Sequence, residues 1–94
     1  MVKAIWKNVV LAQSNNCEII ERNYYFPPDS IKQAYFKKSD THTVCFWKGR
    51  ASYYNIEIDG EVNEDAAWYD PSPKDAAKNI KNYIAFWKGV EVQK

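Results

Sequence analysis

The dipeptide Asp59-Gly60 is the strongest hairpin signal in this chain, because both residue types adopt the positive φ angles of tight two-residue turns. The segment before it alternates, with Ser52, Tyr54, Ile56 and Ile58 on one face and Tyr53, Asn55 and Glu57 on the other. Such alternation is typical of an antiparallel strand with one buried face. The chain therefore predicts a long hairpin formed by residues 52–58 and 61–69.

Similar signals predict further strands on both sides of this hairpin. The expected strands are residues 2–6, 9–12, 17–21, 24–26, 41–47, 83–87 and 90–92. Two short helices are expected, one after Pro27-Pro28 and one over residues 74–81, with Ser72 as a cap of the second. The predicted fold class is mainly β (α+β): a compact antiparallel β-sheet domain built from hairpins with two short helices.

Length and composition predict one folded domain over residues 1–94, since no long linker interrupts the chain. The formal net charge of +1 gives no overall field that would attract nucleic acid, so a nucleic-acid partner is not expected. Aromatic residues make up 16% of the chain. A domain this small needs most of those rings in its core, so few of them are expected to serve a ligand.

The cysteine content and the apolar runs predict a cytoplasmic location. Cys17 and Cys45 do not form the dense disulfide scaffold of small secreted domains, and no cleavable signal sequence is recognised. The longest apolar runs, such as residues 83–87, are far shorter than the roughly 20 residues of a membrane-spanning helix. No membrane partner is expected.

Residues 45–54 form the candidate site, because they gather a thiol, basic groups, hydroxyls and aromatic rings around one expected turn. Basic side chains hold an anionic group, and rings stack on a planar one. The expected ligand-binding residues are Trp47, Lys48, Arg50, Ser52, Tyr53 and Trp68. The predicted ligand is an anionic or aromatic small molecule, such as a nucleotide. The plainer alternative is a solvated lysine at a hairpin tip.

Catalytic and metal-binding patterns are weak in this sequence. Cys45 and His42 are the candidate catalytic pair, but three residues apart on one strand they point to opposite faces. Asp40 would have to join them as the third ligand of a metal site, and two cysteines and one histidine cannot supply four zinc ligands. No metal and no cofactor are expected, and the balance is against an enzyme.

Nucleotidyl transfer also lacks a clear signature. Three glycines in the whole chain exclude a glycine-rich phosphate loop. An acidic stretch follows the central hairpin, but its neighbouring side chains alternate sides, which favours a solvated face over a metal-binding pair. Its members are Glu61, Glu64, Asp65 and Asp70.

Five motifs together give the chain a family resemblance. They are residues 4–6 (Ala-Ile-Trp), 25–27 (Tyr-Phe-Pro), 45–54, 66–71 (Ala-Ala-Trp-Tyr-Asp-Pro) and 84–90. With these motifs the chain resembles the family known as domain of unknown function 427, which carries a provisional nucleotidyltransferase label. The resemblance implies a small antiparallel β domain, similar to the β-tent or Mss4-like folds. Family members typically have proline at the position of Phe46.

Three hypotheses on function follow. The first is a binding domain for a small molecule or a protein partner at residues 47–54 and Trp68. The second is an enzyme, either a nucleotidyltransferase or a thiol-dependent one centred on Cys45. The third is an assembly module, a homo-oligomer included, in which an exposed strand edge pairs with another chain.

Overall fold

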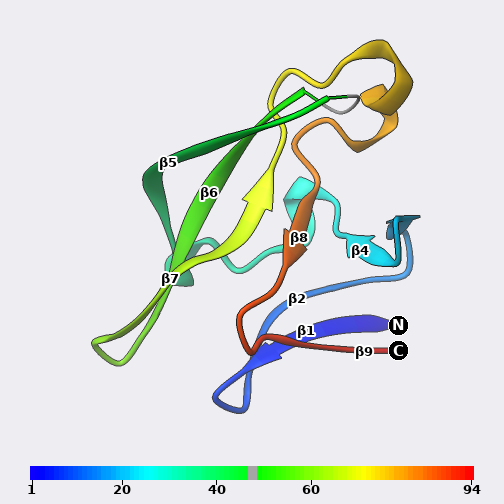
Figure 1. Cartoon of the computed structure of the whole chain (residues 1–94). Helices are drawn as coiled ribbons and strands as arrows, with labels where there is room; N and C mark the ends of the chain where they lie inside the picture. Colours follow the sequence, from blue (N-terminus) through cyan, green and yellow to red (C-terminus); the bar gives the residue numbers. More distant parts are fainter. Residues whose placement is uncertain (47–48) are drawn as a thin grey trace.

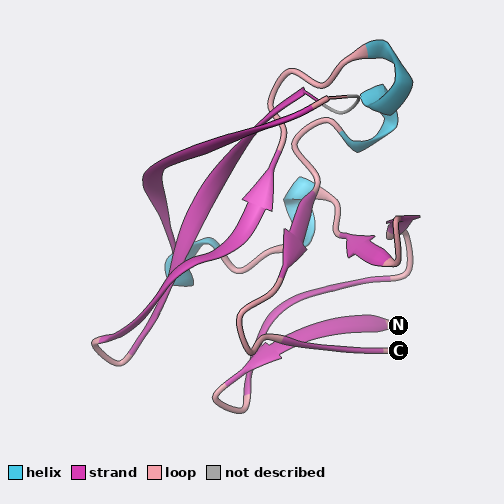
Figure 2. Ribbon diagram, in the orientation of Figure 1, coloured by secondary structure: helices cyan, strands magenta, loops and turns pink. Residues whose placement is uncertain are grey.

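The computed structural model describes residues 1–46 and 49–94. Within these ranges the strands are β1 (Val2–Trp6), β2 (Val9–Ser14), β3 (Glu18–Ile20), β4 (Asn23–Tyr25), β5 (Phe36–Cys45), β6 (Gly49–Ile58), β7 (Glu61–Tyr69), β8 (Ile84–Phe86) and β9 (Glu91–Gln93). They pair antiparallel in three sheets, with the orders β2-β1-β9, β3-β4 and β5-β6-β7-β8 (Figures 1 and 2). The mainly β class predicted from the sequence is confirmed. The relation to the β-tent or Mss4-like folds stays a prediction.

The central hairpin of β6 and β7 forms where the sequence predicts it. Asp59 and Gly60 have φ angles of 50° and 81°, and Ile58 pairs with Glu61 directly beside them. A bulge interrupts the pairing between Tyr54 and Ile56 of β6. It bends the two strands and, as described below, anchors an indole ring.

Strand β5 is longer than the sequence predicts. It begins at Phe36, five residues before the expected start at Thr41, and pairs with β6 from Phe36 opposite Ile56 to Cys45 opposite Gly49. Phe46 lies in a turn rather than in the strand, and Trp47 lies outside the described residues. The pattern of residues 36–40 is mostly polar, which concealed this part of the strand.

The expectation of two short helices was wrong, because the described segments form only 3-10 turns. The first region splits into η1 (Pro28–Ser30) and η2 (Gln33–Tyr35), since Ile31 between them is extended and bridges Ala12 of β2. The amide of Lys32 also donates to the carbonyl of Leu11 at 2.8 Å. Tertiary pairing therefore outweighs the helical spacing of the apolar residues.

The second expected helix is the 3-10 segment η3 (Asp75–Ile80), which is kinked at Ala77. Its capping position is Lys74, with no side-chain cap, so Ser72 does not cap it. A segment of six residues is too short to hold an α-helix by its own hydrogen bonds. Its inward residues Ala77 and Ile80 instead pack with Tyr25 and Ala85 in a small cluster.

The two ends of the chain lie side by side in the three-stranded sheet (Figure 1). The opening hairpin is confirmed, with Lys7 and Asn8 at positive φ angles between β1 and β2. Strand β9 follows the turn at Lys88 and Gly89 and pairs with β1, Lys3 opposite Gln93. This sheet covers one end of the four-stranded sheet.

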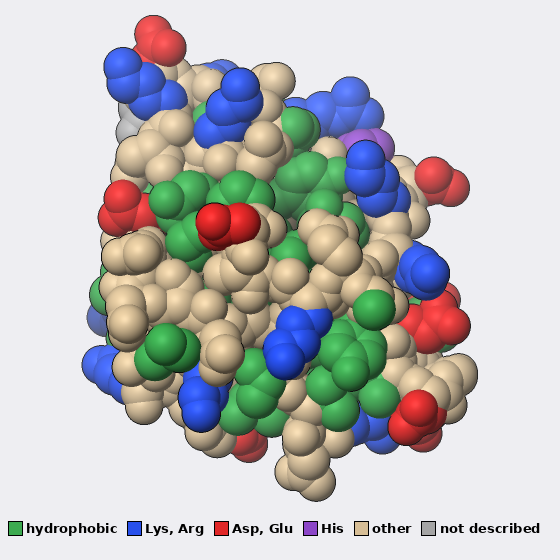
Figure 3. Space-filling view, turned by 180° about the vertical axis from the view of Figure 1, so that it is seen from behind, with side chains coloured by type: hydrophobic (Ala, Val, Ile, Leu, Met, Phe, Trp, Pro, Cys, Tyr) green, Lys and Arg blue, Asp and Glu red, His purple; other side chains and the backbone are tan. Residues whose placement is uncertain are grey.

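The main core lies between these two sheets. Its aromatic centre is formed by Phe26, Phe36 and Phe86, whose rings meet edge to face with centroids 5.5 and 6.0 Å apart. From behind, other hydrophobic side chains appear on the surface in separate groups, with Lys and Arg among them (Figure 3). In the described parts of the chain, no helix has the length and apolar character needed to cross a bilayer.

Candidate functional site

The four-stranded sheet has two faces of different chemistry, because successive side chains of each strand alternate. On the indole face, Thr43 of β5 pairs with Ala51 of β6, and Tyr53 pairs with Trp68 of β7. On the phenol face, Lys38 pairs with Tyr54, and Ser52 pairs with Tyr69. The main core covers only part of the phenol face, whereas short segments cover the indole face.

A cavity of about 220 Å³, here called the indole cavity, lies on the indole face. Its lining residues come from β4, β5, β6, β7, η3 and the residues directly after β7 and β8. They are Tyr25, Thr43, Cys45, Ala51, Tyr53, Trp68, Asp70, Ile80 and Trp87. Four of them are aromatic and one is a carboxylate. Such a cavity, largely apolar with a few polar groups, is the usual form of a small-molecule site.

The aromatic walls stand at steep angles to one another. The ring of Trp68 is nearly perpendicular to those of Tyr25 and Trp87, with interplanar angles of 86° and 82° and centroids 6.3 and 5.8 Å away. The indole nitrogen of Trp68 donates to the hydroxyl of Tyr25 at 3.3 Å. This bond fixes two walls of the cavity relative to each other and occupies the indole donor.

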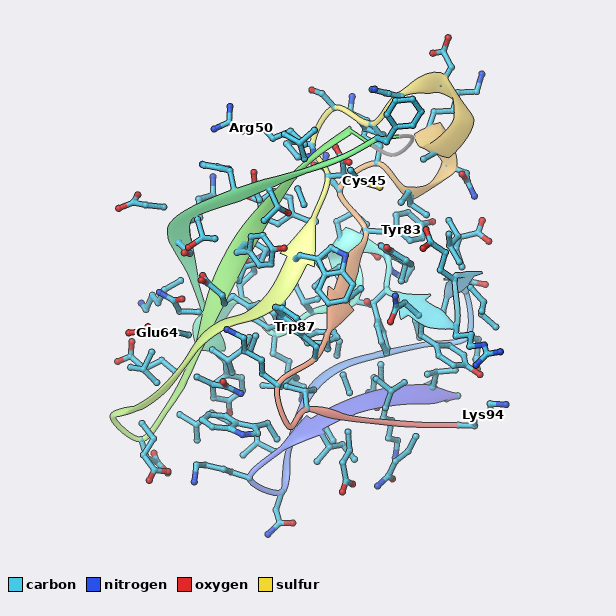
Figure 4. All side chains as sticks on the ribbon, in the orientation of Figure 1. Cys45, Arg50, Glu64, Tyr83, Trp87 and Lys94 are labelled. Atoms are coloured by element: carbon cyan, nitrogen blue, oxygen red, sulfur yellow. The ribbon has the colours of Figure 1, made fainter. Side chains whose placement is uncertain are left out.

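Trp87 is held in place by β7, at the bulge in the pairing of β6 with β7. Its indole nitrogen donates to the carbonyl of Asp65, a residue at a φ of 55° whose amide donates to the side-chain oxygen of Asn55 at 2.9 Å. Trp87, labelled in Figure 4, remains 46% exposed while it lines the cavity. The bulge therefore sets the position of an aromatic wall that the strand pairing alone would not fix.

The carboxylate of Asp65 is itself part of this anchor. A hydrogen bond from Ser39, another from Thr41 and the charge of Lys88 together outweigh desolvation and hold the pKa of Asp65 below its usual value. The hydroxyl of Thr41 donates to Asp65 at 2.8 Å. These contacts tie the middle of β5 to the bulge of β7.

Asp70 supplies the buried carboxylate of the indole cavity. Asp70 is only 6% exposed, although the sequence predicted that it lies on a solvated face. The amide of Asn82 donates to its carbonyl at 2.9 Å, and the chain bridges Lys81 at this point, so the backbone fixes the carboxylate. A Cβ atom on Gly49 would lie 3.3 Å from a carboxylate oxygen of Asp70. Gly49 thus lets the hairpin strand approach the carboxylate closely.

The candidate catalytic pair is divided between the two faces. Cys45 is half-buried and lines the indole cavity. His42 pairs with Ser52 on the phenol face, where its Nδ1 lies 3.1 Å from the hydroxyl of Ser52. The histidine therefore does not stand beside the thiol, which agrees with the strand geometry expected from their spacing.

The expected ligand-binding residues are divided as well. Tyr53 and Trp68 line the indole cavity, whereas Ser52 and the exposed Arg50 belong to the phenol face. Arg50 of β6 lies away from Cys45 and Trp87 in Figure 4. The remaining two, Trp47 and Lys48, lie outside the described residues.

Sequence reasoning missed several residues of the cavity. Tyr25, Asp70 and Trp87 lie far apart in the chain, yet each belongs to one of the motifs that gave the family resemblance. Those motifs were the available signal. Asp40, His42 and Cys45 do not form a metal site, since residues 1–46 and 49–94 hold no group of three or more His, Cys, Asp or Glu side chains suited to an ion.

Comparison with known proteins assigns the chain to a family. A search of curated proteins gave no match. A family model described as a domain of unknown function (DUF427), which carries a nucleotidyltransferase label, matches residues 1–94. The match includes every motif of the sequence resemblance and every residue that lines the indole cavity. The chain therefore belongs to the DUF427 family.

Proposed function

We propose that this protein binds a small organic molecule in the indole cavity, and that the molecule carries a compact cationic group such as a methylated ammonium. The single observation that supports this most is the combination of four rings with the buried carboxylate of Asp70. Among the described residues of the lining there is no basic side chain. The cavity as described therefore presents negative charge and π electrons.

The physical basis is the attraction between a cation and the faces of aromatic rings. Each such contact contributes roughly 0.5–1 kcal/mol at exposed sites and about 2 kcal/mol where the cation is desolvated. The steep angles between Trp68 and its neighbours form walls on several sides of one cation, and the indole nitrogens of Trp68 and Trp87 already have acceptors. The rings thus offer the ligand their faces rather than hydrogen-bond donors.

The anionic ligand expected from the sequence is less well supported at this cavity. It depended on Lys48 and Arg50, of which Arg50 belongs to the opposite face and Lys48 lies outside the described residues. The aromatic part of that expectation is retained, because a planar group also packs against Tyr53 and Trp68. The charge of the ligand therefore distinguishes the cationic molecule proposed for this cavity from the anionic molecule expected from the sequence.

A matched pair of probes tests the role of the charge. Choline and 3,3-dimethylbutan-1-ol have the same shape, but only choline carries a positive charge. Titration by calorimetry should show choline binding at least tenfold more tightly, since about 1.4 kcal/mol of cation–π and ionic attraction suffices for that factor. Equal affinity for both probes would contradict the proposal.

Two variants and a control locate the binding. Asp70→Asn and Trp87→Leu should each weaken choline binding about tenfold or more, because they remove the carboxylate charge and one aromatic wall. Glu64→Gln, which removes an exposed carboxylate outside the cavity, should leave it unchanged. Thermal melting of each variant verifies folding, and Trp87→Leu remains informative if Asp70→Asn is unstable.

A thiol-dependent reaction at Cys45 is the second candidate, because its sulfur belongs to the same cavity. Cys17 is a natural internal reference, since it is also half-buried and burial raises the pKa of its thiol. Iodoacetamide should label Cys45 faster than Cys17, and choline should slow the labelling of Cys45 alone. Equal rates without protection would remove this candidate. For nucleotidyl transfer, residues 1–46 and 49–94 offer no group of three or more His, Cys, Asp or Glu side chains that could hold its metal ions.

A further inference from the structure

The phenol face carries a second cavity, of about 430 Å³, here called the phenol cavity. Its lining residues are Pro28, Ile31, Gln33, Lys38, Tyr54, Tyr69, Pro71, Asn82 and Ile84. Its volume falls in the usual range of small-molecule sites, roughly 300–1,000 Å³. The strands β6 and β7 separate it from the indole cavity, and the two cavities share no lining residue.

The polar groups that line the phenol cavity can all donate hydrogen bonds, and the amides and hydroxyls among them can also accept. They are the ammonium of Lys38, the amides of Gln33 and Asn82, and the hydroxyls of Tyr54 and Tyr69. Among the described residues, none that lines this cavity is acidic. The charge of this lining is therefore opposite to that of the indole cavity, where Asp70 is the charged group.

The two phenols form one unit beside the lysine. Tyr54 and Tyr69 stack with centroids 4.6 Å apart and an interplanar angle of 26°, and Lys38 pairs with Tyr54 across β5 and β6. Burial, the neighbouring charge of Tyr69 and a hydrogen bond with Tyr69 raise the pKa of Tyr54. Because one of the two hydroxyls donates to the other, the pair keeps one proton for a ligand.

Lys38 pairs directly with Tyr54, so its positive charge lies beside the two phenols. Farther along the strands, Arg50 of β6 lies opposite Val44, and the exposed Asp40 of β5 lies between Lys38 and His42, where the pairing with β6 is interrupted. The lining also has an apolar part, which consists of Ile31, Ile84 and the prolines Pro28 and Pro71. A ligand that fits both features has a negative group and an apolar body.

We propose that the phenol cavity is a second binding site, which takes a small organic carboxylate. The ammonium of Lys38 and the remaining proton of the hydroxyl pair of Tyr54 and Tyr69 hold the carboxylate, and Ile31, Ile84 and the two prolines contact the apolar body. This site does not depend on the function proposed for the indole cavity, because it uses different residues on the opposite face.

Benzoate and benzamide are suitable probes, since they share shape and differ in charge. Titration followed by NMR should show benzoate shifting the resonances of Tyr54 and Ile84, with benzamide binding at least tenfold more weakly. If benzamide binds as well as benzoate, or if millimolar benzoate shifts no resonance of the cavity, the proposal is overturned.

The chain provides a matched pair of variants on adjacent residues. Lys37 and Lys38 are both exposed on β5, but Lys37 pairs with Asn55 and belongs to the other face. Lys38→Met should weaken benzoate binding about tenfold, and Lys37→Met should leave it unchanged. Equal losses in both variants would show non-specific attraction to a basic surface and would refute the site. Both side chains are exposed, so both variants are expected to fold.

Tyr54→Phe tests the contribution of the Tyr54 hydroxyl separately from that of the Lys38 charge. It should weaken benzoate binding several-fold while choline binding at the indole cavity stays unchanged. Loss of choline binding in this variant would indicate a general structural effect and count against two separate sites. Choline failing to bind the unmodified protein, with benzoate still binding, would refute the function proposed above and leave this inference intact.

Discussion

The two faces of the four-stranded sheet receive side chains from the same strands, yet they have opposite roles. The phenol face is covered at one end by the three-stranded sheet, and there Ile56, Ile58 and Phe36 belong to the main core. The indole face is covered by β4, η3 and single side chains, which leave a cavity lined with rings. The three-stranded sheet fills the space where it covers the phenol face, whereas short irregular segments leave room for a ligand on both faces, η3 at the indole cavity and η1 and η2 at the phenol cavity.

The sign of the charge also differs between the faces. The described lining of the indole cavity has a buried carboxylate, and that of the phenol cavity has an ammonium and neutral donors. Because strand residues alternate, one substitution changes one face and leaves the other in place. The following predictions use that separation, beginning with the largest expected effect.

Replacing a core residue of the phenol face should cost far more stability than replacing a cavity residue of the indole face. Ile56 is fully buried, and Ile56→Ala should lower the free energy of unfolding by about 2–5 kcal/mol. Tyr53 is partly exposed, and its hydroxyl contacts the exposed Thr43, so Tyr53→Leu should cost less than about 1.5 kcal/mol. Urea denaturation measures both. Similar losses would mean that the two faces are packed alike.

Gly49 tests the close approach of the hairpin to Asp70. Gly49 has a φ of 115° and Gly60 one of 81°, but only at Gly49 would an added Cβ meet neighbouring atoms within 4 Å. Gly60→Ala should cost about 1–2 kcal/mol from backbone strain alone, and Gly49→Ala should cost at least about 1 kcal/mol more. Gly49→Ala should also weaken choline binding, whereas Gly60→Ala should not. Equal effects on both measurements would argue against the contact with Asp70.

The smallest expected effect concerns alkaline pH on the phenol face. The pKa of Tyr54 is raised above its ordinary value of 10.0, so the folded protein holds this proton more tightly than the unfolded chain. That contribution to stability is fully present below about pH 10 and declines as the pH rises further. Tyr54→Phe should therefore flatten the loss of stability in alkaline urea titrations. Tyr24→Phe is the control for loss of a half-buried phenol, and an unchanged slope in Tyr54→Phe would contradict the assignment.

The sequence predicted local features better than it predicted the site. The Asp59-Gly60 turn determines its hairpin locally, and that prediction is confirmed. Successive side chains of a strand point to opposite faces, so an even-numbered and an odd-numbered residue such as Arg50 and Tyr53 lie on different faces. The division of the expected ligand residues between the two faces could therefore be predicted from the sequence. The burial of Asp70 was not, because it depends on pairing with residues 81 and 82, which follow an irregular segment.

The prediction of two helices was wrong for a related reason. Apolar spacing predicted a helix around Ile31, but the bridge to Ala12 holds that residue extended. Long-range pairing of this kind leaves no periodic pattern in the sequence. The same holds for Trp87, which follows β8 but is held in the cavity by the bulge of β7.

The two faces should prefer ligands of opposite charge, and one NMR experiment tests this division most directly. Choline and benzoate are titrated separately into the same labelled protein, with the indole N–H signals of Trp68 and Trp87 and the ring signals of Tyr54 and Tyr69 observed together. Choline should shift the indole signals and benzoate should shift the signals of the two phenols, each with little effect on the other face. Choline acting on the phenols, or benzoate acting on the indoles, would contradict it.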